Sequence, residues 1–555
     1  MWILGLNTPP AGWHDTAACL IDGEGRVVAF SEQERHSRVR HAIAEAGSQP
    51  VDAVAYCLAR AGITLRDVDV VAVGWDDRQL FPGRFADDRD FLEQALGSSF
   101  DGVHVPELVR VPHHRAHAAS SFYASPFAKA AVLVADGNGE NESTTVWTFA
   151  DGAEPVLHQS WPRTASLGYA YNAASVWLGF NHLNAGKTMG LAAYGRARGL
   201  EVERLVKVGG GDYRLAVAPL AERPGRSTDE DLGRDYQRML LAWREVYSKV
   251  AGVAGPSAPL ERLHEDPAAV LVAYTAQRIV EDVMGELSHA ARQAAGVEEL
   301  CLAGGIALNC SANGQLPGPV FVPPVPHDAG VALGAAWTVR PPVRREGPIS
   351  PYLGVAIGGT GDRAPEQDTS GLVRSEASVE RVTDLLLDHR VGAVAQGRAE
   401  VGPRALCHRS IIALPDTADV HTRVNQIKDR EQWRPFAGVT RPEYGSLLWE
   451  RQEHLNRYML GAARTTAHAG AVAPGVVHVD GTTRPQVLEG DEAPVVGAVL
   501  DRLSALGQPA VLLNTSFNGR GEPIVNTSYD ALRAFRRMDL DFLVLGDVLY
   551  EKRGR

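Results

Sequence analysis

Residues 130–140 read AAVLVADGNGE, and residues 299–314 read ELCLAGGIALNCSANG. Each stretch is a short apolar run that ends in glycine, which is typical of a strand followed by a turn where backbone amides can approach a phosphate. The same pattern opens the chain, where MWILGLN at 1–7 precedes AACLIDGEGRVVAFSE at 17–32. Three such units, two of them opening similar hairpins, predict a duplicated α/β domain with a nucleotide cleft between its halves. Strands often end in glycine, so one such turn alone decides little.

Helical patterns lie between these strands. Apolar residues recur at helical spacing over 51–63 and over 268–296, where the pattern ends at a glycine. The sequence from 200 to 266 is polar and irregular, which favours a solvated insertion over a variable lid. A stretch rich in Pro and Arg at 340–351 is the best candidate for a linker.

New strand signals follow this linker, at 391–397, 509–517 and 541–547. They alternate with segments of helical pattern and predict a second α/β domain. The predicted boundaries are 1–345 for the first domain and 350–545 for the second, with 546–555 expected to pack back on the first.

Length and composition limit the classes of protein to consider. The chain has 555 residues, and single cores stop growing near about 300 residues, so two or three domains are expected. The formal net charge of −12 argues against a protein that binds nucleic acid through a general basic surface. The five cysteines are scattered without a CxxC pair, which favours a reducing cytoplasm over a disulfide framework. No apolar run approaches the length of about 18 residues that a membrane span needs.

A Gly-Lys-Thr sequence lies in GFNHLNAGKTMGLAAYG at 179–195. In a P-loop, four residues separate the first glycine from the Gly-Lys pair, so that consecutive amides wrap the phosphates. Here six residues intervene between Gly179 and Gly186. The two extra residues break the concave nest of amides, and a turn before a helix is the simpler interpretation of this segment alone.

The sharpest local signal is VPHHRAHAASSFYAS at 111–125. On a helix, His113 and His117 would lie on one face, about 6 Å apart along the axis, which suits one metal ion between two imidazoles. Asp136 and Asp328 each lie shortly before a glycine and could add two carboxylate oxygens. Such a mixed shell suits iron or zinc acting as a Lewis acid.

Alternatives to this metal site remain open. A His pair four residues apart on a helix is often only a pair of polar side chains exposed to solvent. His14 and His114 are further histidines that are either satisfied in the core or general bases.

A second cluster is basic, with seven Lys and Arg residues from Arg398 to Arg434 in a chain that is acidic overall. Pro403, Trp433 and Phe436 interrupt it, and apolar side chains of this size are costly to leave exposed together. A pocket in which arginines bind oxyanions is therefore favoured over a solvated face, with a ligand that carries several phosphate charges. The members expected in or beside this pocket are Arg404, Arg409, Lys428, Arg434, Arg484, Asn514, Ser516 and Asn518. For the Asn and Ser residues, simple turn chemistry is the alternative.

Together these motifs resemble the NodU/CmcH-type O-carbamoyltransferases, including the tobramycin-pathway enzyme. The matching motifs, in the family's order, are WHDTAACLIDG (13–23), PHHRAHA (112–118), GKTMGLAAYG (186–195), GGIALNCSANG (304–314), PPVPHDAGVALGAA (323–336), GPRALCHRSI (402–411), QIKDREQWRPFA (426–437) and LNTSFNGRGEPIV (513–525). They span nearly the whole chain, which is more specific than any one motif.

The resemblance implies an N-terminal Kae1-like domain of the actin/sugar-kinase/Hsp70 class and a C-terminal YrdC-like α/β domain. It implies that the second domain forms carbamoyl adenylate from carbamoyl phosphate and ATP, with Mg²⁺ a candidate companion of the nucleotide. The first domain then transfers the carbamoyl group to a hydroxyl of a small natural product, such as an antibiotic or its sugar. An enclosed route between the sites is expected, because carbamoyl adenylate would hydrolyse in bulk water.

The resemblance also implies roles for individual residues. The metal ligands are His113, His117, Asp136 and Asp328, and the ion is iron in the tobramycin-pathway relative. The catalytic residues are His14, His114, Lys428 and Arg434. The residues expected to bind nucleotide or substrates are Arg40, Gly137, Gly186, Lys187, Gly304, Gly305, Asn309, Arg404, Arg409, Lys428, Arg434, Arg484, Asn514, Ser516 and Asn518. Gly186 and Lys187 then belong to an actin-like nucleotide cleft, and His14 is a candidate to take the proton of the acceptor.

Departures from the family pattern concern the acceptor contacts. Gln33 stands where a third acidic residue is usual, Arg40 where Lys is common, and Cys407-His408 where Gly followed by Asn or Gln is usual. The sequence leaves open the identity of the acceptor and whether the chain forms a homodimer.

Two rival functions use the same features. A threonylcarbamoyl-adenylate enzyme that modifies tRNA has both domain types, but the acidic balance and the lack of a basic arm disfavour it. A non-catalytic nucleotide sensor needs only one of the two clusters, and this chain has both.

Overall fold

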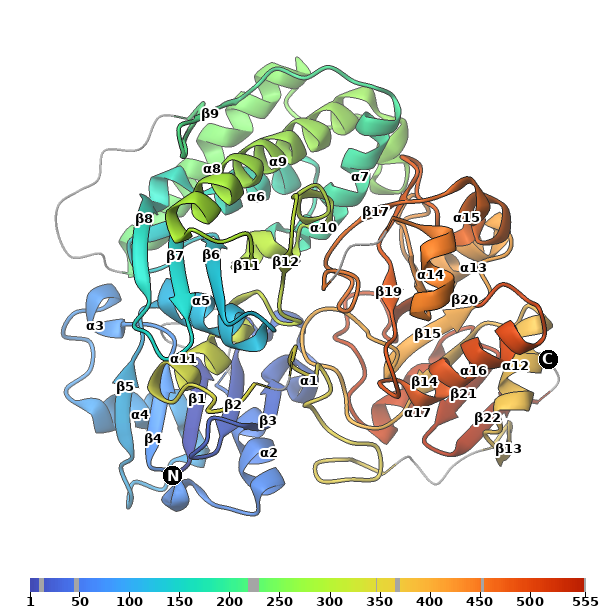
Figure 1. Cartoon of the computed structure of the whole chain (residues 1–555), viewed down its shortest axis with the longest axis horizontal. Helices are drawn as coiled ribbons and strands as arrows, with labels where there is room; N and C mark the ends of the chain where they lie inside the picture. Colours follow the sequence, from blue (N-terminus) through green and yellow to red (C-terminus); the bar gives the residue numbers. More distant parts are fainter. Residues whose placement is uncertain are drawn as a thin grey trace.

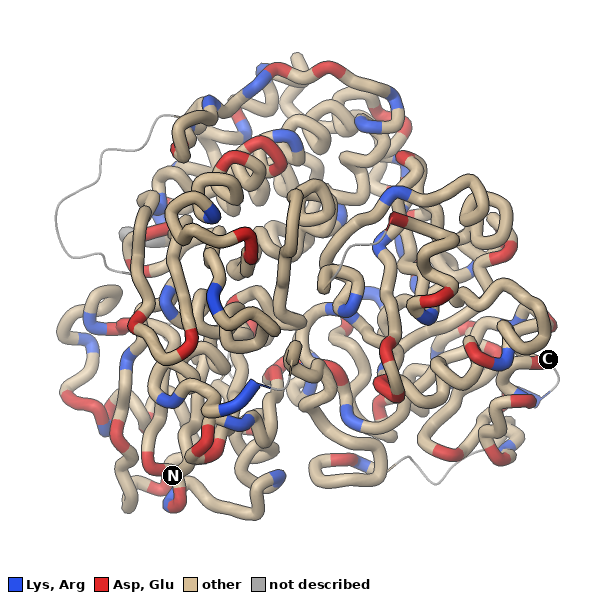
Figure 2. Tube along the Cα trace, in the orientation of Figure 1, with Lys and Arg blue, Asp and Glu red and all other residues tan. Residues whose placement is uncertain are grey.

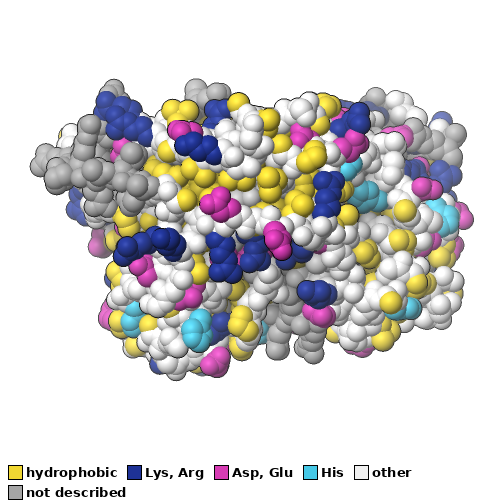
Figure 3. Space-filling view, turned by 90° about the horizontal axis from the view of Figure 1, so that it is seen from above, with side chains coloured by type: hydrophobic (Ala, Val, Ile, Leu, Met, Phe, Trp, Pro, Cys, Tyr) yellow, Lys and Arg dark blue, Asp and Glu magenta, His cyan; other side chains and the backbone are white. Residues whose placement is uncertain are grey.

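The computed structural model describes residues 1–8, 14–43, 49–217, 229–345, 347–364, 370–450 and 454–553. Figure 1 shows two halves side by side, the N-terminal one in blue to yellow-green and the C-terminal one in orange to red. Figure 2 shows Lys and Arg interspersed with Asp and Glu along the whole trace, and Figure 3 shows side chains of both signs among hydrophobic ones on the face seen from above. Within these ranges, no helix is both long and apolar enough to cross a membrane.

Two five-stranded sheets form the N-terminal half and share one topology. The first, ordered β3-β2-β1-β4-β5, contains β1 (Ile3–Asn7), β2 (Ala17–Ile21), β3 (Val27–Glu32), β4 (Val70–Val73) and β5 (Glu107–Arg110). The second, ordered β12-β11-β6-β7-β8, contains β6 (Lys129–Ala135), β7 (Glu142–Ala150), β8 (Val156–Pro162), β11 (Leu300–Ala303) and β12 (Val320–Phe321). In each sheet, the first three strands in chain order pair antiparallel, and the last two in chain order extend the sheet in parallel. The predicted duplication is therefore confirmed in the sheet topology.

The predicted helices of this half are also present. Helix α2 (Val51–Ala61) packs on β2 and β3 and ends at Gly62, which is left-handed. Helix α9 (Pro267–Ala295) packs on β6, and Asp266 caps its first amides. Its C-cap is Gly296, in the left-handed conformation that glycine adopts without strain.

Helices α5 (His113–Ala124) and α11 (Val331–Val339) pack against each other between the two sheets. Small residues permit this close approach, because a Cβ added at Gly334 would lie only 1.8 Å from the carbonyl oxygen of Ala116. Helix α11 also contacts β1, β2 and β4, while α5 contacts β6 and β11. The packing brings the start of α5 close to the start of α11.

The 200–266 segment is less irregular than predicted. Its described part contains the hairpin β9 (Val206–Gly209) and β10 (Asp212–Leu215) and the helix α8 (Asp229–Ala251), while residues 218–228 lie outside the described ranges. Trp243 and Tyr247 of α8 are fully buried, and α8 packs on α6 (Leu167–Trp177). The prediction of a solvated insertion is wrong for this helix, because a few apolar residues on one face are enough to bury it in the core.

An eight-stranded sheet forms the C-terminal half, in the order β13-β22-β21-β14-β15-β20-β16-β19. Its strands are β13 (Leu372–Glu376), β14 (Gly392–Ala395), β15 (Arg409–Ala413), β16 (Ala437–Thr440), β19 (Gln486–Val487), β20 (Val511–Ser516), β21 (Phe542–Leu545) and β22 (Val548–Lys552). The three strands predicted for this half correspond to β14, β20 and β21. The prediction that the tail packs on the first domain is wrong, because β22 pairs with β21 and β13 inside this sheet.

Helices cover this sheet and complete the C-terminal half. They include α12 (Val379–Leu387), α13 (Ala418–Ile427), α16 (Pro494–Ala505) and α17 (Ser528–Arg537). The predicted linker at 340–351 has no helix or strand in its described part, and it is tied to the first half. The amide of Val343 donates to the Glu24 carbonyl at 2.9 Å, and that of Ile349 to the Ala124 carbonyl at 3.0 Å.

The two halves meet through buried polar contacts. Asn313 Nδ2 donates to the Leu460 carbonyl at 2.8 Å, and the Gly402 amide donates to Glu32 Oε2 at 2.9 Å. A Cβ added at Gly314 would lie 2.1 Å from the Ala462 carbonyl oxygen, so the backbones touch at that point. This close fit holds the functional side chains of one half against those of the other.

Candidate functional site

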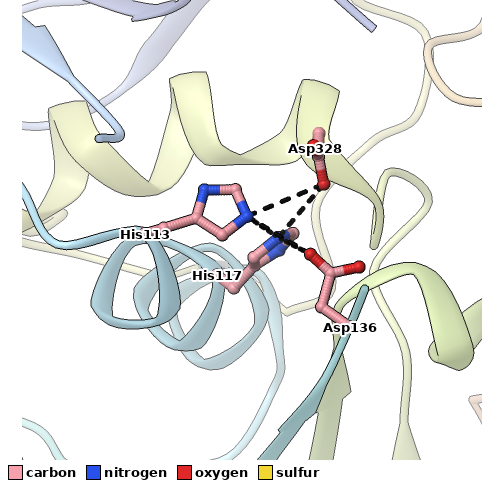
Figure 4. Close-up of side chains that lie close together, drawn as sticks. All are labelled: His113, His117, Asp136 and Asp328. Carbon is pink, nitrogen blue, oxygen red and sulfur yellow. Dashed lines mark hydrogen bonds and ion pairs between the residues drawn. The ribbon is translucent and has the colours of Figure 1, made fainter. Parts of the chain in front are cut away.

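Four residues predicted as metal ligands lie together at the junction of α5 and α11. His113 and His117 project from the first turns of α5, Asp136 follows the end of β6, and Asp328 precedes α11 (Figure 4). Asp136 Oδ2 lies 3.3 Å from His113 Nε2 and 3.4 Å from His117 Nε2. Asp328 Oδ1 lies 3.7 and 3.6 Å from the same two nitrogens. One ligand atom from each residue falls within 4.8 Å of the others.

The donor set fits a divalent cation. His113 donates Nδ1–H to the Gly74 carbonyl at 3.1 Å, which leaves the lone pair of Nε2 facing the tetrad. The Nε2 atoms of His113 and His117 are 3.1 Å apart, and both side chains are fully buried. Two imidazoles and two carboxylates supply the nitrogen and oxygen ligands that zinc and iron accept.

Electrostatics also concentrate negative charge on this tetrad. Burial alone lowers the pKa of His113, but the Asp136 and Asp328 carboxylates outweigh it and raise the pKa to about 10. Burial raises the pKa of Asp136, yet His113 and His117 hold it well below its usual value. Burial and Asp136 raise the pKa of Asp328, but His14, His113 and His117 outweigh them and lower it to about 2, so both aspartates are ionised at neutral pH, as a metal ligand must be.

Glycines predicted to cradle phosphates instead support this tetrad. The Gly305 amide donates to Asp136 Oδ1 at 2.9 Å, and the Gly304 amide donates to the Pro326 carbonyl at 2.8 Å. Gly304 has a φ of +86°, and a Cβ there would lie 2.2 Å from the Ala135 carbonyl oxygen. Both amides therefore have protein partners in this structure, and phosphate binding by either glycine stays a prediction.

Gly137 follows Asp136 in the same turn, where it closes against helix α6. Ser166 Oγ donates to its carbonyl at 2.6 Å. A Cβ added at Gly168 would lie 2.8 Å from the Gly137 Cα. The residue thus shapes the turn that presents Asp136.

His14 lies beside the tetrad, and His114 lies behind it. His14 Nδ1 is 2.9 Å from Asp15 Oδ2 and 3.8 Å from Asp328 Oδ2, with 37% of the side chain exposed. Burial opposes protonation of His14, but Asp328 and Asp15 raise its pKa to about 9. His114 is fully buried, Thr145 Oγ1 lies 3.0 Å from its Nδ1, and burial lowers its pKa well below 6.5. The catalytic role of His114 stays a prediction, and in this structure its ring is a buried neighbour of Thr145.

The C-terminal half holds a second centre around Lys428, the C-cap of α13. Lys428 is 6% exposed, and its Nζ donates to Asn518 Oδ1 at 2.8 Å and to the carbonyls of Asn518 and Ser516. Ser516 Oγ in turn donates to Asn518 Oδ1 at 2.7 Å. The predicted Lys428, Ser516 and Asn518 therefore form one contact group at the end of β20.

Arginines surround this lysine. Burial, Arg430, Arg434 and Arg40 together hold the pKa of Lys428 well below its usual value. Burial and then Arg484 lower the pKa of Arg404 to about 9. These shifts have a common cause, which is like charge gathered in a partly dry space. Such a cluster favours an anionic ligand.

Residues of the N-terminal half reach this basic cluster. Lys187 Nζ pairs with Glu431 Oε1 at 2.7 Å, while Arg434 Nη1 lies 3.7 Å from Glu431 Oε2. Arg404 Nη2 donates to the Leu308 carbonyl at 3.3 Å, and Arg40 Nη1 lies 3.5 Å from Asn184 Oδ1. Gly186 is exposed in the first turn of α7 (Ala185–Ala197), so the Gly-Lys-Thr sequence starts a helix as expected from its spacing.

Three residues predicted to bind ligands make contacts inside the protein. Arg409 is fully buried and donates to the carbonyls of Gln396, His408, Val355, Gly397 and Asn526. Asn514 Nδ2 donates to the Ala405 carbonyl and to Gln486 Oε1. Asn309 pairs its amide with that of Gln277 and caps α10 (Cys310–Asn313). The buried Asn514 Oδ1 has no hydrogen-bond partner among the residues that the structure describes, and ligand binding by these three residues stays a prediction.

Four residues of these centres had not been predicted. Asp15 and His41 lie beside His14, and Arg430 and Glu431 lie inside the basic cluster. Three of them, Asp15, Arg430 and Glu431, lie inside the motifs quoted above. Their only signal in the sequence was that each is an ionisable residue close to a predicted site residue. His41 lies at the end of SEQERHSRVRH and contacts Asp15 only through the tertiary fold.

The chain is similar to one family over most of its length. Residues 3–81 and 83–337 match the model for the carbamoyltransferase N-terminus, and residues 383–552 match the model for the carbamoyltransferase C-terminus. The nodulation protein NolNO of Sinorhizobium fredii is 31% identical over 594 residues, covering 99% of this chain and 80% of that protein. The 3′-hydroxymethylcephem-O-carbamoyltransferase of Amycolatopsis lactamdurans is 28% identical over 575 residues, covering 97% of this chain and 98% of that protein.

Solved structures match less closely. Full-length HypF in its phosphate- and nucleotide-bound form has a TM-score of 0.33 and 13% identity, over 62% of this chain and 56% of that chain. A TM-score this low does not establish a shared arrangement of domains.

Proposed function

The chain belongs to the carbamoyltransferase family, and from that premise we propose that it works as an O-carbamoyltransferase in two steps. In the first, water releases inorganic phosphate from carbamoyl phosphate, and the carbamate that remains attacks the α-phosphate of ATP to give carbamoyl adenylate and pyrophosphate. In the second, an acceptor hydroxyl attacks the carbamoyl carbon and AMP leaves. One observation carries the proposal: the two halves hold two buried centres of opposite charge, one of histidines and carboxylates and one of Lys and Arg.

The basic cluster suits the first step. ATP and carbamoyl phosphate are both anionic, so bringing them together requires positive charge placed before they bind. Lys428 and Arg434 lie where they can hold the reacting phosphates, and Arg404 and Arg484 add charge around them. Arg40 comes from the other half, so the site is complete only when the two halves are in contact.

The His and Asp tetrad suits the second step. Fe²⁺ or Zn²⁺ would be held by His113, His117, Asp136 and Asp328, and Mg²⁺ would accompany ATP at the other centre. When bound, the cation at the tetrad supplies Lewis acidity that polarises a carbonyl oxygen.

We assign to His14 the role of accepting the proton of the acceptor hydroxyl. It stands beside Asp328 and is partly exposed, so a substrate can reach its ring. The carboxylates of Asp328 and Asp136 contribute to its raised pKa. With those two carboxylates engaged by a cation, Asp15 remains as the carboxylate that holds the ring.

The fold supports a finer assignment of the domains. The N-terminal half, 1–345, is proposed to be Kae1-like, since its two sheets repeat one topology as actin-like ATPase domains do. The C-terminal half, from about 350 to the end of β22, is proposed to be the YrdC-like domain that forms the adenylate. The five cysteines are all free and buried, which fits the proposed cytoplasmic location.

The acceptor is proposed to be a small hydroxylated natural product, such as an antibiotic or its sugar. The relative from Amycolatopsis lactamdurans carries the name of such an acceptor, a 3′-hydroxymethylcephem. A tRNA acceptor is not favoured, because charges of both signs are interspersed along the trace (Figure 2).

Two assays separate the steps. Exchange of labelled pyrophosphate into ATP, dependent on carbamoyl phosphate, measures adenylate formation. Mass spectrometry of tobramycin and of a 3′-hydroxymethylcephem, after incubation with ATP and carbamoyl phosphate, detects the gain of one carbamoyl group. Exchange without carbamoyl phosphate dependence, or none at all, would overturn the proposed first step.

A further inference from the structure

Asp15 holds two histidines at once. Its Oδ2 lies 2.9 Å from His14 Nδ1, and its Oδ1 lies 2.9 Å from His41 Nδ1. Burial raises the pKa of Asp15, but His327, His41 and His14 lower it well below its usual value, so the group is a carboxylate. A carboxylate only accepts hydrogen bonds, so each ring must carry a proton on Nδ1 where it meets Asp15.

The backbone around this contact is strained, and hydrogen bonds hold it in that conformation. Asp15 has a φ of +55° and His41 a φ of +64°, both unusual for residues other than glycine. The Asp15 amide donates to the His41 carbonyl at 2.6 Å, and the His41 amide donates to Glu34 Oε2 at 2.7 Å. Asn7 Nδ2 donates to the carbonyls of His14 and Asp15, both at 3.0 Å. Strain of this kind persists where the surroundings over-determine it, and it gathers at functional sites.

The same contacts tie Asp15 to the tetrad. Asn7 Oδ1 accepts from Trp75 Nε1 at 3.0 Å, and the Trp75 ring stacks on His113 at 3.6 Å. His41 is thereby fixed at its amide, its carbonyl and its Nδ1. Its Nε2 is buried and has no hydrogen-bond partner among the residues that the structure describes.

Asp15, Glu34 and His41 offer ligand atoms within 4.8 Å of one another, which by itself resembles a second cation site. The hydrogen bonds argue for another use. Glu34 accepts the His41 amide, and Asp15 accepts from the His41 ring, so protons already occupy the space between these groups.

We propose that Asp15 and His41 are positioning residues for carbamoyl transfer. This inference rests on the two-step reaction proposed above. With Asp136 and Asp328 engaged by a cation, Asp15 holds His14 in the neutral tautomer with Nδ1–H, which leaves the Nε2 lone pair for the acceptor hydroxyl, and His41 holds the second oxygen of Asp15. The acceptor oxygen bonds to the carbamoyl carbon, the bond from that carbon to the adenylate oxygen breaks with its electron pair on AMP, and the hydroxyl proton passes to His14 Nε2.

Variants of both residues test the proposal. Asp15→Asn can no longer force a proton onto Nδ1 of His14, whereas His41→Asn keeps a side-chain donor for Asp15 that His41→Ala lacks. Asp266→Asn and His36→Asn are matched controls, because Asp266 caps α9 and His36 bonds Ser31 Oγ. Each protein is assayed for pyrophosphate exchange, for carbamoyl transfer to tobramycin and a 3′-hydroxymethylcephem, and for the His14 tautomer by ¹⁵N NMR, assigned with His14→Gln.

The expected result separates the two steps. Asp15→Asn lowers the kcat of transfer by about 100-fold or more, as loss of an orienting carboxylate does, while exchange stays at the level of the controls. Its His14 signal loses the fixed Nδ1–H tautomer, and His41→Asn retains at least about tenfold more transfer than His41→Ala. Full transfer in Asp15→Asn, or equal loss in His41→Asn and His41→Ala, would overturn the assignment.

The NMR result judges the inference even if the proposed function fails. If the native protein carries out neither exchange nor transfer, the two-step reaction is wrong. In that event an unchanged His14 tautomer in Asp15→Asn refutes the positioning role separately.

Discussion

His113 Nε2 lies 3.1 Å from His117 Nε2, with Asp136 Oδ2 at 3.3 and 3.4 Å from the two nitrogens. Two imidazole lone pairs that face each other repel unless a proton or a cation lies between them. The tetrad is therefore built to be completed by a positive charge. Helix geometry brings the two rings together, and the packing of α5 on α11 adds the carboxylates.

We expect His117→Ala to lose the metal and the transfer step but not the adenylate step. Metal content by mass spectrometry should fall to background, and pyrophosphate exchange should persist, since the basic cluster lies in the other half. His114→Gln is the matched control on the same helix, because the His114 ring bonds Thr145 Oγ1 and supplies no ligand atom to the tetrad. Loss of exchange in His117→Ala would refute the division of labour between the two centres.

Removal of metal should make stability depend on pH above neutrality. The folded pKa of His113 is about 10 against 6.5 in the unfolded chain, so its stabilising contribution is complete below pH 6.5 and is lost as the pH rises through 10. The Tm of chelator-treated protein should therefore fall between these pH values. Added Zn²⁺ should raise the Tm more at the higher pH, because the metal competes with fewer protons there. A Tm of the metal-free protein that rises over this range would contradict the pKa shift.

Lys428→Ala should abolish pyrophosphate exchange, and Arg484→Ala should reduce it strongly. Both remove positive charge from the space where we place the phosphates, and one such electrostatic contact contributes about 100-fold or more to a rate. Arg381→Ala is the control, because Arg381 pairs with Glu551 on the surface. Pyrophosphate should raise the Tm of the native protein and of the control more than that of either variant. Equal Tm shifts in all four proteins would argue against this location of the site.

Arg409→Met should destabilise the fold rather than alter the chemistry. The substitution leaves several buried carbonyls without a donor, and each such group costs about 1–3 kcal/mol. Urea unfolding should show a loss of at least about 3 kcal/mol. Any remaining folded enzyme should exchange pyrophosphate with an unchanged KM for ATP, whereas a raised KM would restore the predicted ligand contact.

Gly304→Ala distinguishes a metal support from a phosphate cradle. A Cβ at this position would collide with the Ala135 carbonyl, directly before Asp136, and the left-handed φ adds strain. Metal affinity by calorimetric titration should fall while the KM for ATP stays unchanged. The reverse pattern would return Gly304 to the nucleotide site.

The order of residues along the chain was enough to predict several features, because each of them depends on residues that are neighbours in the sequence. Apolar runs that end in glycine predicted β1, β6 and β11, and the glycine that closes the 268–296 pattern predicted the end of α9. The four-residue spacing of His113 and His117 placed them on one helix face. For Arg409 and Asn514 the sequence does not show which partner they take, because a polar residue in a motif has the same letter whether its partner is a ligand or a buried carbonyl.

By itself the sequence determined the fold class, the duplicated strand pattern and the residue types of two charged centres, since local spacing and composition encode them. Only the tertiary structure decided which of those residues share a site. Asp328 is far from His113 in the chain and reaches it because α11 packs on α5, while β22 belongs to the eight-stranded sheet because its backbone pairs there. Contacts between distant residues depend on how whole elements pack, and no single stretch of sequence records that packing.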